Sequence, residues 1–412
     1  ERLIEIALDL VRNPVPLHPR RRLLERTRLG RLVLYGYAAR DVARRTRGQY
    51  PALAAALDCI RTGLEEGRDA GFDQEARLVS GLAVGPVAKN LIRLFFLRER
   101  ARKDSGPVPA IERISLGRRD ETAEVVAQLA ALAGIAVEVR EEPVRRRVAR
   151  LLDVAVAKGK ATSAEATAAL GRVSLNPDPP ADLAIEGAGP LGISPGQGLP
   201  RLEFFPPVLR SPMVEIARAP DTPEDAVRAA AALVRRLGKL ALVVRGAGGL
   251  VGRLGAAYAA AGEAFAEECV SFVEVDARLE SFGMAAGPFR FGGERGLRPP
   301  LYDRRGHAIR KSVRGERRTR DRTVGGEEIV DRVVLALVNE SVAALAEGVA
   351  GADAIDLATI LALGFPPFRG GVLRHAEERG LAAIQSRMES IGLAPHPFLI
   401  DAAARGAIRT SE

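Results

Sequence analysis

Apolar residues recur at intervals of three and four over the first hundred positions, which is typical of amphipathic helices. The stretch from Leu3 to Val11 has this spacing, and the prolines between Pro14 and Pro19 interrupt it. Because the chain opens with Glu1 already in a helical pattern, we expect it to continue a longer polypeptide. The pattern predicts an all-helical region over residues 1–106, with further helices at 23–43, 52–66, 74–82 and 87–102.

The pattern changes after the stretch rich in Gly and Pro at 105–109, where short apolar runs begin to alternate with helical periods. A strand is predicted from Arg113 to Leu116, followed by Gly117, a helix over 120–133, and a second strand over 136–140 before Glu141. This is the βαβ order of a dinucleotide-binding fold. We therefore expect residues 107–247 to form one shortened, mostly parallel sheet with flanking helices.

Three further helices and two strands are predicted between 149 and 244. Helices are expected at 149–157 and after Thr162, and a buried strand at 181–186. Thr222 and Pro223 are typical of an N-cap and a first helical position, and a last strand is expected at 239–244. Between 187 and 200 the chain has only a short run rich in Gly and Pro. Its one hydroxyl side chain, Ser194, is expected to be a turn residue.

From residue 254 onward the chain returns to helical spacing and contains an internal repeat. Glu268, Asp276 and the run Phe282–Phe289 are echoed by the acidic stretch Glu347–Asp356 and the run Leu363–Gly371. The Gly and Pro residues in these runs are expected to end one helix and turn the chain sharply into the next. The repeat predicts two tandem all-helical domains over 248–320 and 321–412.

Composition and charge exclude several classes of protein. Hydrophobic content of 47% and charged content of 27% are ordinary for a globular chain, and no run of apolar residues is long enough to predict a membrane span. The formal net charge is +9, but only 4% of residues are aromatic and the arginines are spread through every segment, so we expect no nucleic-acid partner. Cys59 and Cys269 fit neither a disulfide framework nor a thiolate metal site, which favours the cytoplasm. The four histidines, with His307 in the basic run 304–322, indicate no metal site.

The most informative stretch runs from Arg201 to Ile216 and contains Phe-Phe, Pro-Val and Val-Glu-Ile at fixed spacing. It resembles the catalytic segment of 3-hydroxyacyl-CoA dehydrogenases. A second resemblance lies in the N-terminal region, at Gly48–Pro51, Thr62–Gly67 and Asp73–Arg77. These stretches are similar to the segment of bacterial fatty-acid β-oxidation multifunctional proteins that joins the enoyl-CoA hydratase (crotonase) part to the dehydrogenase part. The resemblance implies an N-terminal helical linker, a degenerate Rossmann-like NAD-binding domain and two tandem helical dehydrogenase C-terminal domains.

Several polar residues of the dehydrogenase pattern are replaced in this chain. Glu203 stands where the family has its catalytic His, and Pro206 stands where it has Asn. Glu215 matches the Glu that orients the His, so Glu203 and Glu215 are the candidate catalytic positions. Gly252 stands where a second Asn reaches the active site in the family. The segment after Glu186 that carries further polar ligands in the family is expected to be deleted.

The glycine-rich turn that accepts a dinucleotide pyrophosphate is also degenerate. Its three Gly places read Gly117, Arg119 and Thr122, so a long side chain fills the space that the pyrophosphate needs. Glu141 lies where an acid would bind the ribose hydroxyls, but the degenerate turn favours a solvated residue at a strand end over a ribose ligand. Gly117 and Glu141 are the remaining candidate cofactor residues, and we expect no bound cofactor, although the family uses NAD.

These substitutions leave two functions of different classes and favour the first of them. In the first, residues 107–412 are a non-catalytic scaffold for an upstream hydratase half. In the second, the chain is an active NAD-dependent 3-hydroxyacyl-CoA dehydrogenase that uses Glu203 as its base. Acyl-CoA, a thiolase or a second copy of the chain are further expected partners. Arg369 and Arg374 are architectural residues or ligands of a CoA phosphate.

Overall fold

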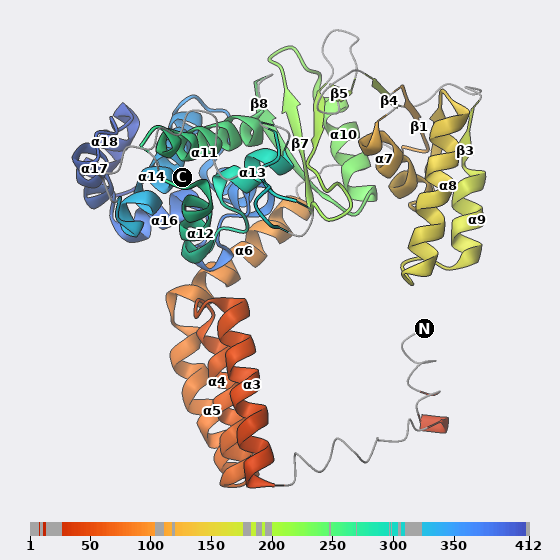
Figure 1. Ribbon diagram of the computed structural model, residues 1–412. Coiled ribbons are helices and arrows are strands. Elements are labelled where there is room, and N and C mark those ends of the chain that lie inside the picture. Colours follow the sequence, from red (N-terminus) through yellow and green to blue (C-terminus); the bar gives the residue numbers. More distant parts are fainter. Residues whose placement is uncertain are drawn as a thin grey trace. The chain divides into compact units, whose positions relative to one another are not determined.

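The computed structural model divides into two compact units, an N-terminal unit of residues 1–89 and a C-terminal unit of residues 90–412, which are described separately (Figure 1). All three predicted domain boundaries, at 106, 247 and 320, lie outside the described residues, as do Arg119, Ser194, Cys269 and most of the basic run 304–322. The structure describes residues 8, 11–13, 27–103, 111–117, 120–175, 183–186, 192–193, 200–246, 249–268, 270–295, 297, 299–303, 306–309 and 324–408.

The N-terminal unit is helical, as the sequence predicts. It contains α3 (Arg28–Thr46), α4 (Pro51–Glu65), α5 (Arg68–Ala83) and the start of α6 (Pro86–Lys103). Helix α5 begins six residues earlier than expected, because Gly67, at φ 109°, turns the chain directly from the end of α4 into a new helix. Helices α4 and α5 approach closely at two glycines: a Cβ added to Gly71 would lie 2.9 Å from the Cα of Gly63.

No single helix in the described part of the chain is both long and apolar enough to cross a membrane. Helices α5 and α6, which are bent relative to each other, meet the length and composition criteria only when taken as a pair.

The first sheet of the C-terminal unit has the expected βαβ start. The strands β1 (Arg113–Leu116) and β2 (Ala136–Val139) are parallel neighbours, joined by helix α7 (Glu121–Leu132). The sheet order is β3-β2-β1-β4-β5, and β5 alone is antiparallel to its neighbour. The remaining elements are α8 (Glu142–Ala157), α9 (Ser163–Gly171), β3 (Val173–Ser174), β4 (Leu183–Glu186) and β5 (Gly192–Ile193).

The prediction of a single sheet is wrong, because the last three strands form a second sheet of order β6-β7-β8. The two-residue strand β5 turns back on β4 and is not hydrogen-bonded to β6 in the described residues. Both sheets nevertheless share one apolar core, to which β1, β2, β6 and β7 contribute buried side chains. The second sheet comprises β6 (Arg201–Phe204), β7 (Met213–Arg218) and β8 (Leu240–Arg245), with helix α10 (Glu224–Arg236) between β7 and β8.

Two helix starts differ from the sequence prediction. Helix α8 begins at Glu142 rather than at 149, since Pro143 is favourable in a first helical turn. Helix α10 begins at Glu224, and Pro223 rather than Thr222 is its N-cap residue. The hydroxyl of Thr222 instead accepts a hydrogen bond from the backbone N–H of Ala219, so it closes the preceding turn.

The C-terminal half of the unit is helical, and its apolar core contains side chains of the long helices α11 and α14 together with buried side chains of β7 and β8 (Figure 1). A π-helical turn, η2, and a 3₁₀ turn, η3, separate α15 from α16. The elements are α11 (Leu250–Glu267), α12 (Phe272–Phe282), α13 (Pro288–Glu294), α14 (Gly326–Ala346), α15 (Ala352–Ala358), η2 (Thr359–Leu363), η3 (Pro367–Arg369), α16 (Val372–Arg379), α17 (Leu381–Ser390) and α18 (Pro397–Arg405).

Each copy of the internal repeat contains a turn that is held by a buried aspartate. The carboxylate of Asp276 accepts backbone N–H groups of Phe289 and Arg290, at 2.9 and 3.0 Å, at the start of α13. In the same way, one oxygen of Asp356 accepts from the first turn of α16, 2.8 Å from the nitrogen of Leu373 and 3.2 Å from that of Arg374. Each carboxylate therefore satisfies donors that a helix start leaves unpaired.

In each of these two turns, one glycine follows the end of a helix and another glycine precedes the start of the next helix. Gly283 and Gly364 each follow a helix in the left-handed conformation, at φ 119° and 75°. Gly283 follows Asp276 by seven residues and Gly364 follows Asp356 by eight, and the π-helical turn η2 accommodates the additional residue. The N-cap residues of α13 and α16 are Gly287 and Gly371, and a Cβ added to either would lie within 2.5 Å of the aspartate.

We expect Gly287→Ala to lower the free energy of unfolding by about 2–3 kcal/mol, because its Cβ would lie 2.3 Å from the Cα of Asp276 in a packed turn. Gly351→Ala is the matched control. Gly351 is also an N-cap residue with φ near −70°, but a Cβ there meets nothing within 4 Å. The control should cost less than about 1 kcal/mol. Urea unfolding of both variants checks the difference, and equal costs would contradict the close approach at Gly287.

Candidate functional site

The structure brings the two candidate catalytic positions together. Strands β6 and β7 are antiparallel, and Glu203 lies directly opposite Glu215 in their register. Side chains that face each other across such a pair lie on one side of the sheet, with Cβ atoms about 5 Å apart. Glu215 is fully buried and the side chain of Glu203 is 13% exposed. The site is therefore a pair of acids in a largely dry environment.

Glu215 caps the first turn of helix α11. Its Oε1 accepts the backbone N–H of Leu250 at 2.9 Å, and its Oε2 accepts that of Val251 at 2.8 Å. Gly249 makes this approach possible, since it has φ 72° and a Cβ there would lie 2.5 Å from Oε1 of Glu215. Both oxygens of the carboxylate are thus engaged by backbone donors at a helix N-terminus, where negative charge is favoured.

Burial raises the pKa of both acids. The pKa of Glu215 rises to about 7, chiefly through loss of solvent; the N–H of Val251 opposes the rise and the charge of Glu203 adds to it. The pKa of Glu203 is also raised by burial, and the charges of Arg201 and Arg295 oppose the shift. The pair consequently favours states in which at least one carboxyl group is protonated near neutral pH.

Two arginines accompany Glu203. Arg201 precedes it by two residues on the same face of β6, with Nη2 3.6 Å from Oε2 of Glu203. Arg295 follows helix α13; its guanidinium carbon lies 5.1 Å from the ring centroid of Phe205 and 5.4 Å from that of Phe291. Burial lowers the pKa of Arg295, and the charge of Glu203 partly restores it. Strand alternation could have indicated Arg201, whereas no motif singled out Arg295.

Gly252 lies beside this pair, as the resemblance implies for the residue at its position. A Cβ added to Gly252 would be 3.9 Å from Oε1 of Glu203. Gly252 therefore has no side-chain amide, unlike the Asn of the family, that could reach a substrate at this point. Pro206, which replaces the other Asn, is exposed and lies two residues after the end of β6.

The candidate cofactor residues belong to the other sheet. Gly117 follows β1, and Glu141 follows β2 as the N-cap residue of α8. The intervening helix α7 begins with an acid that sequence inspection did not select: Oδ1 of Asp120 accepts the backbone N–H of Ala123 at 2.9 Å. Glu121 adds a second negative charge in the same turn. A dinucleotide pyrophosphate needs free N–H groups and positive potential at this helix end, so these residues do not fit NAD.

Arg369 and Arg374 are both engaged within the fold. The guanidinium of Arg369 lies 4.0 Å from the ring centroid of Phe282, and its Nε donates to the carbonyl oxygen of that residue at 3.3 Å. Nε of Arg374 donates to Glu378 at 3.1 Å and lies 3.4 Å from the Asn90 side-chain oxygen. These contacts agree with the architectural alternative for both arginines. In the residues for which the structure gives positions, no cluster of three or more His, Cys, Asp or Glu side chains could hold a metal ion.

The raised pKa of Glu215 predicts a pH-dependent stability. Because the folded pKa of about 7 exceeds the ordinary value of 4.5, folding takes up a proton between these values, and stability falls as pH rises from about 5 to 8. We expect the fall to be about 2 kcal/mol smaller in Glu215→Gln. Asp276, whose pKa burial raises to about 6, acts in the same direction and is retained in both proteins. Urea unfolding at pH 5 and pH 8 measures the slope, and identical slopes would refute the assignment to Glu215.

Comparison with known proteins shows which proteins this chain is similar to. No family model matches the chain. The fatty acid oxidation complex subunit alpha of Idiomarina loihiensis is 24% identical over 491 aligned positions, which cover 94% of this chain and 69% of the relative. The protein of the same name from Vibrio cholerae is 26% identical over 495 positions, covering 94% and 68%. Both alignments are longer than the 412-residue chain, so each relative carries segments that this chain lacks.

A solved structure supports the same relationship at the level of the fold. The crystal structure of 3-hydroxybutyryl-CoA dehydrogenase from Escherichia coli matches with a TM-score of 0.56 and 17% identity, over 72% of this chain and 99% of that chain. The predicted resemblance to the C-terminal, dehydrogenase part of the fatty-acid-oxidation multifunctional proteins is therefore confirmed. The Rossmann-type dehydrogenase fold, combined with a large helical content, is likewise confirmed.

Proposed function

We propose that residues 107–412 form a 3-hydroxyacyl-CoA dehydrogenase-like region of a fatty-acid-oxidation protein that no longer oxidises substrate and acts as a scaffold for an enoyl-CoA hydratase half. The observation that carries this proposal is the helix start at α7. There the Asp120 carboxylate, 2.9 Å from the nitrogen of Ala123, takes a backbone donor that a pyrophosphate would need. A region that cannot hold the dinucleotide has no acceptor for the hydride.

The acid pair supports the same conclusion. In a dehydrogenase of this kind, a base takes the hydroxyl proton while hydride leaves for the cofactor. Glu203 could accept a proton, but its partner Glu215 already uses both oxygens to hold α11. At Gly252 there is no side chain to position a substrate. The site thus retains its structural contacts while lacking the polar groups that place reacting atoms.

The retained packing explains how such a region can remain useful. The two aspartate-held turns, at Asp276 and Asp356, support an arrangement of tandem helical domains over 248–320 and 321–412. Arg253 strengthens the link between α11 and α14, since it pairs with both Glu340 and Glu347. A rigid body of this kind suits the binding of an acyl-CoA intermediate, a thiolase or a second copy beside the hydratase half.

One observation favours the alternative of an active dehydrogenase. Burial raises the pKa values of both Glu203 and Glu215, the charge of Glu203 adds to the rise at Glu215, and carboxylates with raised pKa values serve as bases in enzymes. The experiment that separates the two functions is the oxidation of NADH with acetoacetyl-CoA. If the region is a scaffold, the chain does not oxidise NADH. If it is an active dehydrogenase, the chain oxidises NADH and Glu203→Gln abolishes the reaction.

A further inference from the structure

The two copies of the internal repeat pack directly against each other within the C-terminal unit. At this contact, which we call the joint, residues 282–285 of the first copy meet residues 364–369 of the second. The backbone N–H of Ala285 donates to the carbonyl oxygen of Gly364 at 2.9 Å. A Cβ added to Gly283 would lie 2.8 Å from the nearest side-chain carbon of the second copy. The joint is therefore a close contact between segments that are far apart in the sequence.

One of the four histidines of the chain, His375 on helix α16, lies in the joint. The centroid of its ring is 5.4 Å from that of Phe282 in the first copy and 5.9 Å from that of Phe365 in the second. The two Phe rings are also 5.9 Å apart. Phe365 is fully buried and His375 is 7% exposed. The imidazole thus completes a cluster of three rings to which both copies contribute.

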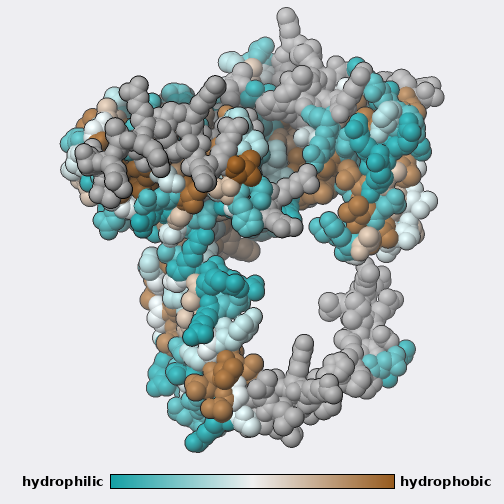
Figure 2. Space-filling model, viewed as in Figure 1, coloured by the Kyte–Doolittle hydropathy of each residue, from teal (hydrophilic) through white to brown (hydrophobic). Residues whose placement is uncertain are grey.

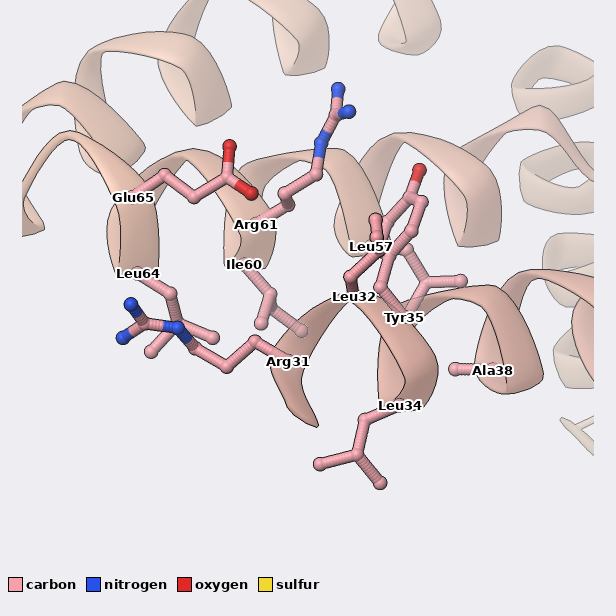
Figure 3. A pocket seen from close by; sticks show the side chains of 10 residues that line it. All are labelled: Arg31, Leu32, Leu34, Tyr35, Ala38, Leu57, Ile60, Arg61, Leu64 and Glu65. Atoms are coloured by element: carbon pink, nitrogen blue, oxygen red, sulfur yellow. The ribbon is translucent and has the colours of Figure 1, made fainter. Parts of the chain in front are cut away.

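The charged groups of the N-terminal unit have a different environment. A groove of about 330 Å³ lies between α3 and α4, and Figure 3 shows the charged ends of Arg61 and Glu65 directed away from Ile60 and Leu64. Hydrophilic and hydrophobic residues lie side by side on the surface of this unit (Figure 2). Both charged residues are exposed, so water solvates them. A charge on the buried His375 would lack this solvation.

The imidazole of His375 also lacks a hydrogen bond that would support a charge. Its Nε2 is buried and has no hydrogen-bond partner among the residues whose positions the structure gives. In a neutral imidazole one ring nitrogen carries no proton, whereas an imidazolium has N–H groups on both nitrogens. Protonation would therefore leave a buried N–H of a charged group without an acceptor, which is unfavourable. The geometry favours the neutral imidazole.

The charged groups that face His375 also oppose its protonation. Burial lowers the pKa of His375 to about 4, and the charges of Arg369 on η3 and Arg379 on α16 add to the fall. Asp331 of α14 acts in the opposite direction. Its two oxygens, however, are each 2.6 Å from a guanidinium nitrogen, one of Arg379 and one of Arg387. This acid is therefore already paired with two arginines.

We propose that the joint between the two repeat copies stays closed only while His375 is neutral, and that mildly acidic pH opens it by placing a charge between the Phe282 and Phe365 rings. In the open joint the imidazole is hydrated and takes up a proton at its ordinary pKa of about 6.5. The closed joint is consequently favoured above this value, and the preference is lost as pH falls towards 4. This switch is independent of the proposed scaffold function, since it involves neither the acid pair nor helix α7.

Amide hydrogen exchange of the full chain at pH 7 and pH 5, corrected for the intrinsic effect of pH on exchange, tests the proposal. The N–H of Ala285 reports on the joint, because its acceptor Gly364 belongs to the other copy. With a pKa of about 4 in the closed joint and about 6.5 in the open one, its protection should be about twentyfold lower at pH 5 than at pH 7. In His375→Phe, which keeps an aromatic ring and cannot take up a proton, the protection should not fall. His307→Gln is the control, since the His307 side chain is 75% exposed, and it should keep the twentyfold fall.

Two results of this experiment would overturn the proposal. Equal protection of Ala285 at both pH values in the unmodified chain would show that the joint does not respond to acid. A fall of the same size in His375→Phe would assign the response to another group. His375→Met, whose flexible side chain fills irregular space, is a second variant without a titratable group and should likewise show no fall.

Nuclear magnetic resonance of the histidine C2 protons provides an independent measurement. The signal that is missing from His375→Phe belongs to His375. In the unmodified chain this signal should still be that of a neutral imidazole at pH 5.5, because the pKa in the closed joint is about 4. A titration midpoint near the ordinary value of about 6.5 would contradict the proposal, since a proton could then bind without opening the joint.

Discussion

The intact chain is expected to show no oxidation of NADH with acetoacetyl-CoA, and Glu203→His is expected to leave the rate at background. A well-placed base accelerates proton transfer by about 10²–10⁴-fold, but only when cofactor and substrate are positioned beside it. In this protein Asp120 occupies a donor at the helix where the pyrophosphate would bind, and Gly252 has no side chain to hold the substrate. Restoring the base alone therefore supplies one part of a site that lacks several.

The rate is measured from the absorbance of NADH at saturating acetoacetyl-CoA. Glu203→Gln is the matched control, because it has the size of Glu and cannot act as a base. The urea midpoints of both variants should show that they are folded. Turnover by the unmodified chain that is lost in Glu203→Gln, or a recovery of more than about 100-fold in Glu203→His, would establish a working cofactor site.

Asp356→Ala is expected to lower the free energy of unfolding by about 3–5 kcal/mol, the range for breaking a buried ion pair. The carboxylate is fully buried and accepts the N–H groups of Leu373 and Arg374. Its second oxygen lies 3.1 Å from Nη2 of Arg93, and Nη1 of the same guanidinium donates to the carbonyl oxygen of Gly370 at 2.9 Å. The substitution removes the acceptor of both N–H groups, and Arg93 loses Asp356 while it keeps Asp353.

Asp353→Ala provides the matched control for this prediction. Asp353 pairs with the same Arg93 and also with Arg100 at 3.6 Å, but its side chain is 46% exposed. Water can replace a partly exposed carboxylate, so the control should cost no more than about 1 kcal/mol. Urea unfolding followed by circular dichroism compares the two variants. Similar costs would show that Asp356 is not the central support of this turn.

The sequence predicted those parts of the fold that depend on local signals. The order β1, α7, β2 follows from apolar runs and helical spacing, and α9 begins at a Thr162 capping box that is visible as Thr and Glu three residues apart. The break between the two sheets was not predictable in this way. It depends on β5 pairing antiparallel with β4, a tertiary choice that two residues of sequence cannot indicate.

The candidate site was predicted where residues lie close in sequence. Glu203 and Glu215 are on adjacent strands of a short β-hairpin, and the resemblance selected both. Arg295 reaches the same site from a distant helix and has no pattern of its own. Asp120 was read as the start of a helix, and the sequence did not single out its acceptance of the Ala123 N–H, the contact on which the proposed loss of NAD binding rests.

Calorimetric titration of the intact chain with NADH measures whether the Rossmann-like region has lost its dinucleotide site. The acids at the start of α7 and the side chains at Arg119 and Thr122 predict no measurable heat of binding at cofactor concentrations up to about 1 mM, which corresponds to less than about 4 kcal/mol of binding free energy. Asp120→Asn removes one negative charge and keeps a capping side chain. Its affinity for NADH should exceed the lowest affinity that the titration can measure by no more than about threefold. A dissociation constant in the micromolar range for the unmodified chain would contradict the account.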